Sequence, residues 1–338
     1  MSDPPERLTI AALEQLASEA LMRAGASETN ANSVARALVA ADVVGQRGHG
    51  VSRVASYAAQ LHAGKVIGNA VPTVELLRPA ALAIDAAHGF AFPALDLAIT
   101  RLPAMAQDFG IAAAGIRRSH HAGALGLVAE RIAQSGLVAL IFANTPSAIA
   151  PWGGQRPLLG TNPIAFAAPR AGQSPIVIDL ALSEVARAKI VGAERKGDTI
   201  PLGWTTDKHG KPTTDPAAAL EGALLPAGGA KGAALALMVE LMAAAVTGAF
   251  FAAEASSFLD DKGAPPATGQ LLIALDGRSL GAGAGMSERI ATLAAEISSE
   301  PGARLPGDRR AALREDARRS GVPVDAGTLR ELRKLAGV

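Results

Sequence analysis

Over the first sixty residues, apolar side chains recur at intervals of three and four, the spacing that places them on one face of a helix. One such run covers Ile10–Arg23, and a second, which Ser27 or Thr29 can cap, reaches about Val44. A glycine-rich stretch separates these runs from a third run that ends at Gly64. The pattern therefore predicts a helical N-terminal segment.

From residue 71 onward the spacing changes, and short runs of strand type alternate with longer amphipathic stretches. The runs expected to be strands are 73–77, 81–85, 111–116, 138–144, 163–169, 175–180 and 270–276. The stretches expected to be helices are 93–109, 122–136 and 184–196. Polar helices follow to the end. The pattern thus predicts an α/β (α+β) protein, with an α/β centre at 71–285 between helical segments at 1–70 and 286–338.

The most apolar stretch, residues 232–253, is long enough to span a membrane. Glu240 stands near its middle, however, and a charged residue at that depth is costly in lipid. We therefore expect a buried helix and no membrane span. The first residues lack a positive region followed by an apolar one, so we expect no signal peptide and a cytoplasmic protein.

Composition narrows the chemistry that is open to the chain. Its 338 residues include no cysteine, which excludes disulfides, thiolate zinc sites, iron–sulfur clusters and a cysteine nucleophile. The formal net charge is +1 and aromatic residues make up 3%, whereas nucleic-acid binders need a basic surface and stacking side chains. We expect a soluble enzyme that does not bind nucleic acid.

The sequence contains no Walker A, G-x-S-x-G or H-E-x-x-H motif. GAGAGM at 281–286 is the nearest approach to a dinucleotide fingerprint, but Met286 replaces the third glycine. We interpret this stretch as a turn. Any nucleotide is therefore expected to bind without the usual Rossmann signature.

The first loop with candidate chemistry is GQRGHGVSRVASY, residues 45–57. His49 lies between glycines at an expected helix start, and Arg53 follows four residues later, so both can face one side. Arg53 can hold a carboxylate through two parallel hydrogen bonds, and His49 can exchange a proton beside it. The alternative interpretation is a helix cap with a surface arginine.

The second loop, RRSHHAGALGLVAERI at 117–132, leads from a strand through two histidines into a helix. Ser119 can cap that helix, and the amides of Ala122–Ala124 can cradle a phosphate. No further histidine or acidic group stands at ligand spacing, so we expect no metal site. The structural alternative is a capped helix start with one buried histidine.

A third loop, residues 144–170, carries two turns rich in Gly and Pro and is a candidate binding wall. We expect Trp152 within it to be a core residue. Further on, Lys231 stands at the start of the long apolar helix, where a cation is unfavourable unless an anion lies nearby. A solvated lysine is the alternative.

Six stretches of the sequence together resemble one family, the malate/L-lactate dehydrogenase-like NAD(P)-dependent oxidoreductases. The resemblance extends from about Leu8 to Gly337. These stretches are GHGVSR, RRSHHAGALG, NTPSAIAPWGGQRPLLGTNPIAFAAP, GWTTDKHGKPTTDP, LLPAGGAKGAALALMVELM and LPGDRR. Within the family, the C-terminal part is most similar to the Δ1-piperideine-2-carboxylate/Δ1-pyrroline-2-carboxylate reductases.

The resemblance implies a homodimer with a non-Rossmann cofactor domain at 71–285, built on a largely antiparallel sheet, and terminal helices that pack together. It implies NADPH as cofactor, with NADH as the alternative. His49 is then the proton donor, Arg53 the clamp on the substrate carboxylate and Thr161 a further substrate contact. The implied cofactor contacts are His121, Ala122, Gly123, Ala124, Leu125, Asp179, Leu180, Ala181, Ala230, Lys231, Gly307, Asp308, Arg309 and Arg310.

The sequence departs from the family pattern at several positions. Gly48 replaces the serine that usually precedes the catalytic histidine, and Ala230 replaces a histidine. Lys189, the second catalytic candidate, stands where the dehydrogenase branch has lysine and imine reductases can have an acid. Arg309 and Arg310 can pair with the 2′-phosphate of NADPH or simply begin a solvated helix.

Our leading hypothesis is NADPH-dependent reduction of a cyclic imine that bears a 2-carboxylate, giving proline or pipecolate. Hydride goes to the imine carbon and His49 protonates the nitrogen. The alternative is a malate- or lactate-type 2-hydroxy-acid dehydrogenase, which Lys189 favours. A third hypothesis, a non-catalytic nucleotide-binding protein, draws on Gly48 and Ala230, but His49 and Arg53 argue against it.

Overall fold

The computed structural model describes residues 5–282 and 285–338. The strands are β1 Glu6–Leu8, β2 Thr73–Arg78, β3 Ala81–Asp85, β4 Ile111–Ser119, β5 Val138–Ala143, β6 Ile164–Arg170, β7 Gln173–Leu180, β8 Thr268–Leu275 and β9 Val322–Val324. The α-helices are α1 Ile10–Arg23, α2 Glu28–Val43, α3 Val54–His62, α4 Ala91–Phe109, α5 Leu125–Ala133, α6 Arg187–Lys196, α7 Pro216–Glu221, α8 Ala230–Glu240, α9 Met286–Ser299, α10 Asp308–Ser320 and α11 Ala326–Ala336. Shorter turns of 3₁₀ or π type are η1 Arg47–His49, η2 Val51–Arg53, η3 Leu241–Ala245 and η4 Arg278–Ala282. The turn expected at 281–286 includes residues 283–284, which lie outside the described residues.

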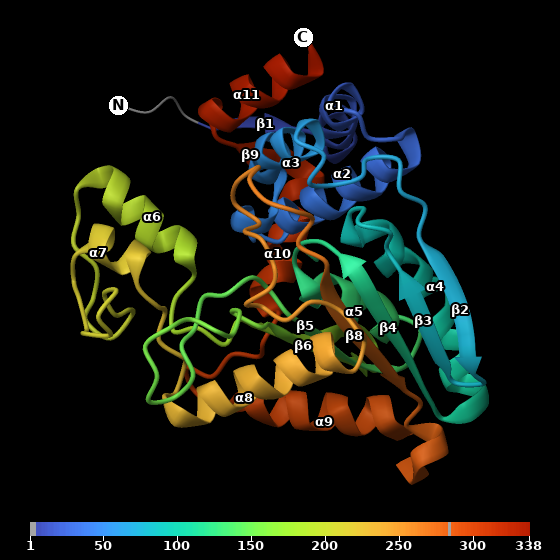
Figure 1. Cartoon of the computed structure of the whole chain (residues 1–338). Helices are drawn as coiled ribbons and strands as arrows, with labels where there is room; N and C mark the ends of the chain where they lie inside the picture. The colour runs from blue at the N-terminus through green and yellow to red at the C-terminus, as the bar shows by residue number, and fades with distance from the viewer. Residues whose placement is uncertain (1–4, 283–284) are drawn as a thin grey trace.

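The centre of the molecule is a seven-stranded sheet in the order β2-β3-β4-β8-β5-β6-β7. Only the pair β3–β4 is parallel among the described pairs, and every other neighbouring pair is antiparallel. The expected strands are therefore confirmed, and so is the expectation of a largely antiparallel sheet. Figure 1 shows the sheet with helices on both faces.

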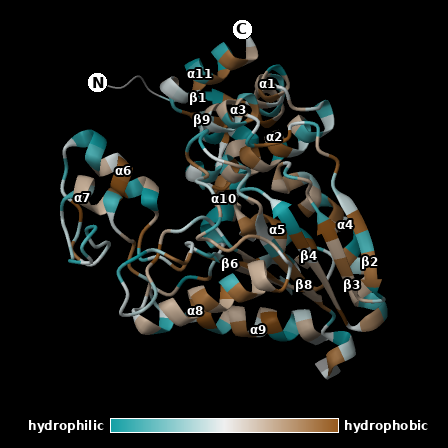
Figure 2. Ribbon diagram, viewed as in Figure 1, coloured by the Kyte–Doolittle hydropathy of each residue, from teal (hydrophilic) through white to brown (hydrophobic). Residues whose placement is uncertain are grey.

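Alternating side chains along the strands enter two separate hydrophobic cores, because successive residues of a strand point to opposite faces. In β5, Ile141 packs with α4, α5 and the terminal helices, whereas Phe142 packs toward α8. In β8, Leu272 and Leu271 divide in the same way. Figure 2 shows hydrophobic positions running through the strands and along α8. The sheet is thus buried on both faces.

The two ends of the chain pack together, as the resemblance implies. Strand β1 pairs antiparallel with β9, and α1 packs on α11. Thr9 caps α1 and Ser27, rather than Thr29, caps α2. On the other side, Arg314 of α10 donates both of its terminal nitrogens to the carboxylate of Glu130 in α5. The terminal helices are therefore fixed to the central sheet as well as to each other.

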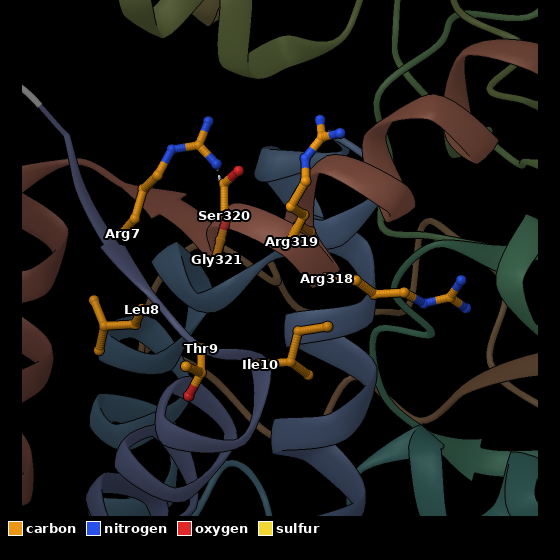
Figure 3. Close-up of a pocket in the computed structure, with 9 residues that line it drawn as sticks. Arg7, Leu8, Thr9, Ile10, Arg318, Arg319, Ser320 and Gly321 are labelled. Carbon is orange, nitrogen blue, oxygen red and sulfur yellow. Dashed lines mark hydrogen bonds between the residues drawn. The ribbon is translucent and has the colours of Figure 1, made fainter.

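A cleft of about 440 Å³ lies between these ends, lined by residues 7–10 and 317–321 (Figure 3). Arg7 is already engaged there, because its guanidinium donates to Asp316 and to the carbonyl of Gly321. The cleft lies at the C-terminal end of α10, whereas the candidate cofactor contact Arg310 lies at its start. At 1.5 Å per residue the two are separated by roughly 15 Å, so this cleft is not the predicted site.

The apolar stretch 232–253 does not form one helix. Helix α8 ends at Glu240, the π turn η3 extends it to Ala245, and Gly248 with φ +72° turns the chain. Glu240 is buried, and its carboxylate accepts hydrogen bonds from the side chains of Asn144 and Asn162 and from the amide of Ala252. Within the described part of the chain, no helix has the length and apolar character needed to cross a membrane. The helix itself is confirmed, but it is shorter than expected, and it is buried on one side only, since Leu235 and Leu237 are exposed.

Candidate active site

His49 lies in a tight loop between α2 and α3 that consists of the two 3₁₀ turns η1 and η2. The carboxylate of Asp42 closes this loop, because its Oδ2 accepts a 2.7 Å hydrogen bond from the amide of Val51. Gly50 is required here, since a Cβ would lie 2.0 Å from Asp42 Oδ1. The expectation that His49 and Arg53 begin a regular helix is wrong: both precede α3, because glycines permit the sharper turns.

Arg53 nevertheless stays beside His49. Its Nε donates a 2.8 Å hydrogen bond to the carbonyl oxygen of Gly48, and its positive charge lowers the pKa of His49. A Cβ at Gly48 would meet no atom within 4 Å. The space next to the residue that precedes His49 is therefore open.

His121, in the connection between β4 and α5, stacks on His49. The ring centroids are 5.1 Å apart and the planes are 12° from parallel. Nδ1 of His49 lies 3.1 Å from Nε2 of His121, and Nδ1 of His121 lies 2.6 Å from the hydroxyl oxygen of Tyr57. The three side chains form a continuous hydrogen-bonded chain from a fully buried phenol to His49.

Burial sets the charge of this chain. Burial lowers the pKa of His49, and the Arg53 guanidinium lowers it further, while Asp179 acts in the opposite direction. Burial also lowers the pKa of His121 well below its ordinary value and raises the pKa of the Tyr57 hydroxyl. Both imidazoles and the phenol are therefore neutral at pH 7.

The proton positions in this neutral chain follow from its partners. When the Tyr57 hydroxyl donates to His121 Nδ1, His121 Nε2–H donates to His49 Nδ1 and the remaining proton of His49 stands on Nε2. The reverse assignment leaves the buried hydroxyl without an acceptor among the described residues. The first assignment satisfies each donor, so His49 has an Nε2–H free for a ligand.

The neighbouring His120 has a separate set of contacts. Its Nε2 lies 2.7 Å from Oε1 of Gln60, and burial lowers its pKa to about 3. Both histidines of the pair are buried, so the alternative with a single buried histidine is wrong. Ser119 does not cap a helix, because it lies in β4 and α5 begins only at Leu125, after the N-cap residue Ala124.

A second polar centre surrounds Asp179 near the end of β7. Its Oδ2 accepts hydrogen bonds from the amide of Gly126 in the first turn of α5, at 3.0 Å, and from Nε2 of Gln46, at 3.2 Å. Nη2 of Arg310 lies 3.8 Å from the same oxygen. Asp179 thus joins the His49 loop, the start of α5 and the start of α10.

Two buried atoms at this centre have no hydrogen-bond partner within the described structure, namely Oε1 of Gln46 and Nη1 of Arg310. Gly307, with φ +99°, leads into α10 close to β7, because a Cβ there would lie 3.7 Å from the backbone of Val177. An unpaired acceptor and an unpaired donor around one carboxylate fit a ligand group that both donates and accepts. The residues present therefore fit a bound cofactor.

The segment after Asp179 leads to the start of α8. The carbonyl oxygen of Leu182 accepts a hydrogen bond from the amide of Ala227 at 2.9 Å, and Ser183 forms a bridge with Pro226. The close turn into α8 requires Gly232, because a Cβ there would lie 1.8 Å from the Ala227 carbonyl oxygen. These contacts bring the two predicted cofactor segments 179–181 and 230–231 to the same part of the molecule.

Thr161 belongs to a polar group at the ends of β5 and β6. Its amide donates to Oγ1 of Thr145 at 2.9 Å, and the two hydroxyl oxygens are 3.2 Å apart. Asn162, which has φ +39°, donates to Glu240 and so anchors the loop to α8. The loop that carries Thr161 is therefore rigidly held.

Three of the predicted residues have other surroundings. Lys189 is exposed on α6, with its Nζ 5.8 Å from the centre of the Trp204 ring, and Figure 1 shows α6 and α7 in a lobe apart from α2 and α3. Arg309 is exposed, whereas Arg310 faces Asp179. Trp152 is 66% exposed, so the prediction that it is a core residue is wrong. Among residues 5–282 and 285–338, no group of three or more His, Asp or Glu side chains can hold a metal ion.

The profile of one protein family, malate/L-lactate dehydrogenase, matches residues 8–333. The chain belongs to this family. It is 46% identical to the (2R)-3-sulfolactate dehydrogenase (NADP(+)) of Chromohalobacter salexigens over 96% of each chain. It is 40% identical to the Δ1-pyrroline-2-carboxylate reductase of Ancylobacter novellus over 98% of each chain. Among solved structures, it is similar to the Δ1-piperideine-2-carboxylate reductase of Pseudomonas syringae, with a TM-score of 0.92, 40% identity and coverage of 98% of this chain and 99% of that one.

Membership of the family confirms the resemblance read from the sequence motifs. Several residues that shape the site were not among the predicted ones, in particular Asp42, Gln46, Tyr57 and Gln60. Gln46 lies inside the predicted loop and Asp42 just before it, and their polar character near glycines is a signal that is present in the sequence. Tyr57 is the only tyrosine of the chain, but its position on the apolar face of a helix is typical of a core residue.

Proposed function

We propose that this protein is an NADPH-dependent reductase of cyclic imino acids and converts Δ1-pyrroline-2-carboxylate or Δ1-piperideine-2-carboxylate to proline or pipecolate. The observation that carries the proposal is the pairing of His49, whose Nε2–H is free, with Arg53 in one loop. The choice of substrate draws on relatives with these reductase names that are 40–42% identical over nearly the whole chain.

In this reaction the C=N bond of the substrate becomes a C–H and an N–H bond. When bound, NADPH would supply the hydride to the imine carbon, and the imidazolium form of His49 would give its Nε2 proton to the imine nitrogen and return to the neutral form. Arg53 holds the 2-carboxylate by paired hydrogen bonds. That carboxylate, placed beside His49, favours the imidazolium form and so opposes the effect of burial on its pKa. Solvent then restores the proton to His49.

The cofactor lies, in this proposal, between the start of α5, the end of β7 and the start of α10. A nicotinamide carboxamide both donates and accepts hydrogen bonds, and it matches the unpaired Oε1 of Gln46 and Nη1 of Arg310. The remaining contacts come from residues 121–125, 179–181, 230–231 and 307–310. The cofactor domain, residues 71–285, is non-Rossmann in this proposal, which its largely antiparallel sheet supports. NADH is the alternative cofactor.

A second candidate is a 2-hydroxy-acid dehydrogenase. It is favoured by the 46% identity to an enzyme named as a sulfolactate dehydrogenase, and by Lys189 at the position where that branch has lysine. Here His49 Nε2 must accept a proton from the hydroxyl group, so His49 starts as the other tautomer. Lys189 then has a catalytic role that the imine reductase does not need.

Oxidation of NADPH by the purified protein separates the two candidates. The substrates are the two cyclic imines, 3-sulfopyruvate, oxaloacetate and pyruvate, each without added amine. We expect turnover of at least one imine, and a loss of kcat of about hundredfold in His49→Ala. Turnover of an oxo acid with neither imine consumed establishes the second candidate instead, and Lys189→Ala then loses activity.

The assembly proposed is a cytoplasmic homodimer. The outer side of α8 and the turn that follows it expose large apolar side chains in the single chain, namely Leu235, Leu237, Met238, Leu241, Val246, Phe250 and Phe251. Such a patch is typical of a surface that is covered by a partner. Light scattering of the purified protein, compared with that of Leu237→Asp, measures whether this face pairs two copies.

A further inference from the structure

The segment between η3 and β8 passes over the histidine pair and is tied down by a buried lysine. The side chain of Lys65 is 0% exposed, and its Nζ donates to the carbonyl oxygens of Ser257, Asp260 and Lys262 at 2.6, 3.0 and 2.6 Å. Nζ also lies 3.4 Å from Oδ1 of Asp260. A buried ammonium with this many oxygen partners fixes the segment closely.

Gln60 connects the same segment to the histidines. Its Nε2 donates a 3.0 Å hydrogen bond to the carbonyl oxygen of Phe258, and its Oε1 accepts from Nε2 of His120 at 2.7 Å. Gln60 is itself fully buried in the last turns of α3. Each polar atom of its side chain therefore has one assigned partner, and together they set the position of Phe258 relative to His120.

Phe258 uses this position to cover both histidines. Its ring centre lies 5.1 Å from that of His120 and 5.5 Å from that of His121, at interplanar angles of 55° and 59°. Tyr57 and Phe90 contact His120 from other directions. The imidazole of His121 is thus held between the rings of Phe258 and Tyr57, which are tilted against it as aromatic pairs favour, and the ring of His49, which stacks on it.

We propose that Phe258 is a positioning residue of the active site, held by Lys65 and Gln60 so that its ring fixes His121 and, through His121, the orientation of His49. The inference rests on the proposed function, because it assigns Phe258 a part in the proton transfer by His49. Phe258 itself does not touch the reacting atoms. A smaller side chain leaves room for water and for rotation of the His121 ring, and both weaken its 3.1 Å contact with His49.

The charged and titratable groups that face the histidines define what a pH profile measures. His49 faces Arg53 of η2, Asp179 of β7 and His121. His120 faces Lys65 and Arg53, and His121 faces Arg53 and the Tyr57 hydroxyl in addition to the two other histidines. Substitution of Phe258 changes none of these charges. A change in the pH profile of kcat/KM therefore reports entry of water beside the histidines or a change in the position of the His121 ring.

The test is Phe258→Leu, with Phe258→Tyr as the conservative variant and Leu259→Ala as the matched control. Leu259 is exposed on the same segment, so its loss leaves the ring contacts intact. With Δ1-pyrroline-2-carboxylate and NADPH, we expect Phe258→Leu to lose about tenfold in kcat with the KM for the imine within about twofold. We also expect the pKa of His49 in its kcat/KM profile to rise by about half a pH unit, since water stabilises the imidazolium. Phe258→Tyr, which keeps the ring, and Leu259→Ala retain the wild-type profile.

Two further measurements keep the result clear. Proton NMR titration of the histidine rings, made without substrate, shows the same upward change in Phe258→Leu even if the protein reduces no imine, so failure of the proposed function and failure of this inference are distinguishable. If Phe258→Leu does not fold, Phe258→Met keeps the volume without the ring and replaces it. A folded variant with unchanged kcat and unchanged histidine titration overturns the inference and leaves residues 257–262 a purely structural segment.

Discussion

His49 and His121, which are 72 positions apart in the sequence, stack with their ring centres 5.1 Å apart and share a 3.1 Å contact between Nδ1 and Nε2. The contact connects the loop after α2 to the connection after β4. It also fixes which nitrogen of His49 remains for a ligand, because Nδ1 is occupied. His49, the proton donor in the proposed reaction, is thus oriented by a second histidine, at a site where the neighbouring residue, Gly48, has no side chain to do so.

Tyr57→Phe tests this chain at its buried end. The substitution keeps the ring in place but removes the hydroxyl that donates to His121 Nδ1, so His121 no longer has a fixed tautomer. We expect kcat for imine reduction to fall about tenfold, and the free energy of unfolding to fall by about 1–2 kcal/mol because a buried nitrogen loses its partner. Steady-state kinetics and urea unfolding measure the two effects. Unchanged kcat together with reduced stability contradicts a role for the chain in proton transfer.

The pH dependence of reduction reports the protonation of His49. Burial, together with Arg53, places its pKa below the ordinary 6.5. Reduction needs the protonated form, so kcat/KM is constant below this pKa and falls tenfold per pH unit above it; oxidation of a hydroxy acid has the opposite slope. In His49→Asn we expect the enzyme's inflection to disappear, while any inflection that belongs to the substrate persists. A profile for the wild type that rises with pH contradicts His49 as proton donor.

Helices, strands and the His49–Arg53 loop could be predicted because each depends on residues that are close in sequence. Periodic apolar positions identified the strands of the sheet, and glycines on both sides of His49 marked the loop. The contacts of His121 with His49 and Tyr57 could not be predicted, because they depend on how the segment after β4 meets η1 and α3. Tyr57 has the sequence position of a core residue, and it is fully buried. Its hydrogen bond to His121 gives it a second role, which the sequence does not show.

The wrong predictions for Trp152 and for residues 232–253 also result from structure that depends on more than residue type. Trp152 was expected in the core from residue type, but it stands in a turn of Pro and Gly that lies on the surface. The apolar stretch 232–253 was expected to continue as a helix, but Gly248 turns the chain and Glu240 is captured by Asn144 and Asn162. The sequence of that segment shows correctly that it is apolar. It does not show that Asn144 and Asn162, which lie far away in the chain, bind Glu240.

Gly48→Ser tests whether a hydroxyl group next to His49, which the family pattern has at this position, would improve the orientation of His49. A Cβ at this position meets no atom within 4 Å and its φ is not in the left-handed region, so the variant should fold with a free energy of unfolding about 0.5 kcal/mol higher, through the loss of glycine's freedom in the unfolded chain. We expect kcat to change by less than about threefold, because His121 already occupies Nδ1 of His49. Gly48→Ala is the control for the Cβ alone. An increase of tenfold or more, in the serine variant only, shows instead that His49 is poorly oriented in the natural chain.

Arg310→Ala and Arg309→Ala separate the two arginines at the start of α10. Arg310 has a buried nitrogen without a partner beside Asp179, whereas Arg309 is exposed. We expect Arg310→Ala to weaken binding of both NADPH and NADH by about tenfold or more, the loss of a hydrogen bond from a charged group. If Arg309 pairs with the 2′-phosphate, Arg309→Ala weakens NADPH alone. Fluorescence titration of each variant with the two cofactors measures both; equal affinities in all three proteins place the cofactor elsewhere.

Asp42→Asn tests the carboxylate that closes the His49 loop. Burial raises the pKa of Asp42 to about 6, against the opposing hydrogen bond from Val51 and the charge of Arg47. Between about pH 4 and 6 the folded protein therefore binds more protons than the unfolded chain, and the free energy of unfolding falls as pH rises through this range. A shift from 3.8 to about 6 corresponds to up to about 3 kcal/mol of lost stability at pH 7.

Asparagine is neutral, and its Oδ1 can still accept the hydrogen bond from Val51. We expect urea unfolding to show the variant about 2 kcal/mol more stable than the wild type at pH 7 and no more stable at pH 4. Asp42→Ala lacks the acceptor for the Val51 amide, so we expect it to be less stable than the wild type at both pH values. It should also lose reductase activity, because the loop that carries His49 and Arg53 loosens. If the difference in stability between Asp42→Asn and the wild type does not vary with pH, Asp42 keeps its ordinary pKa.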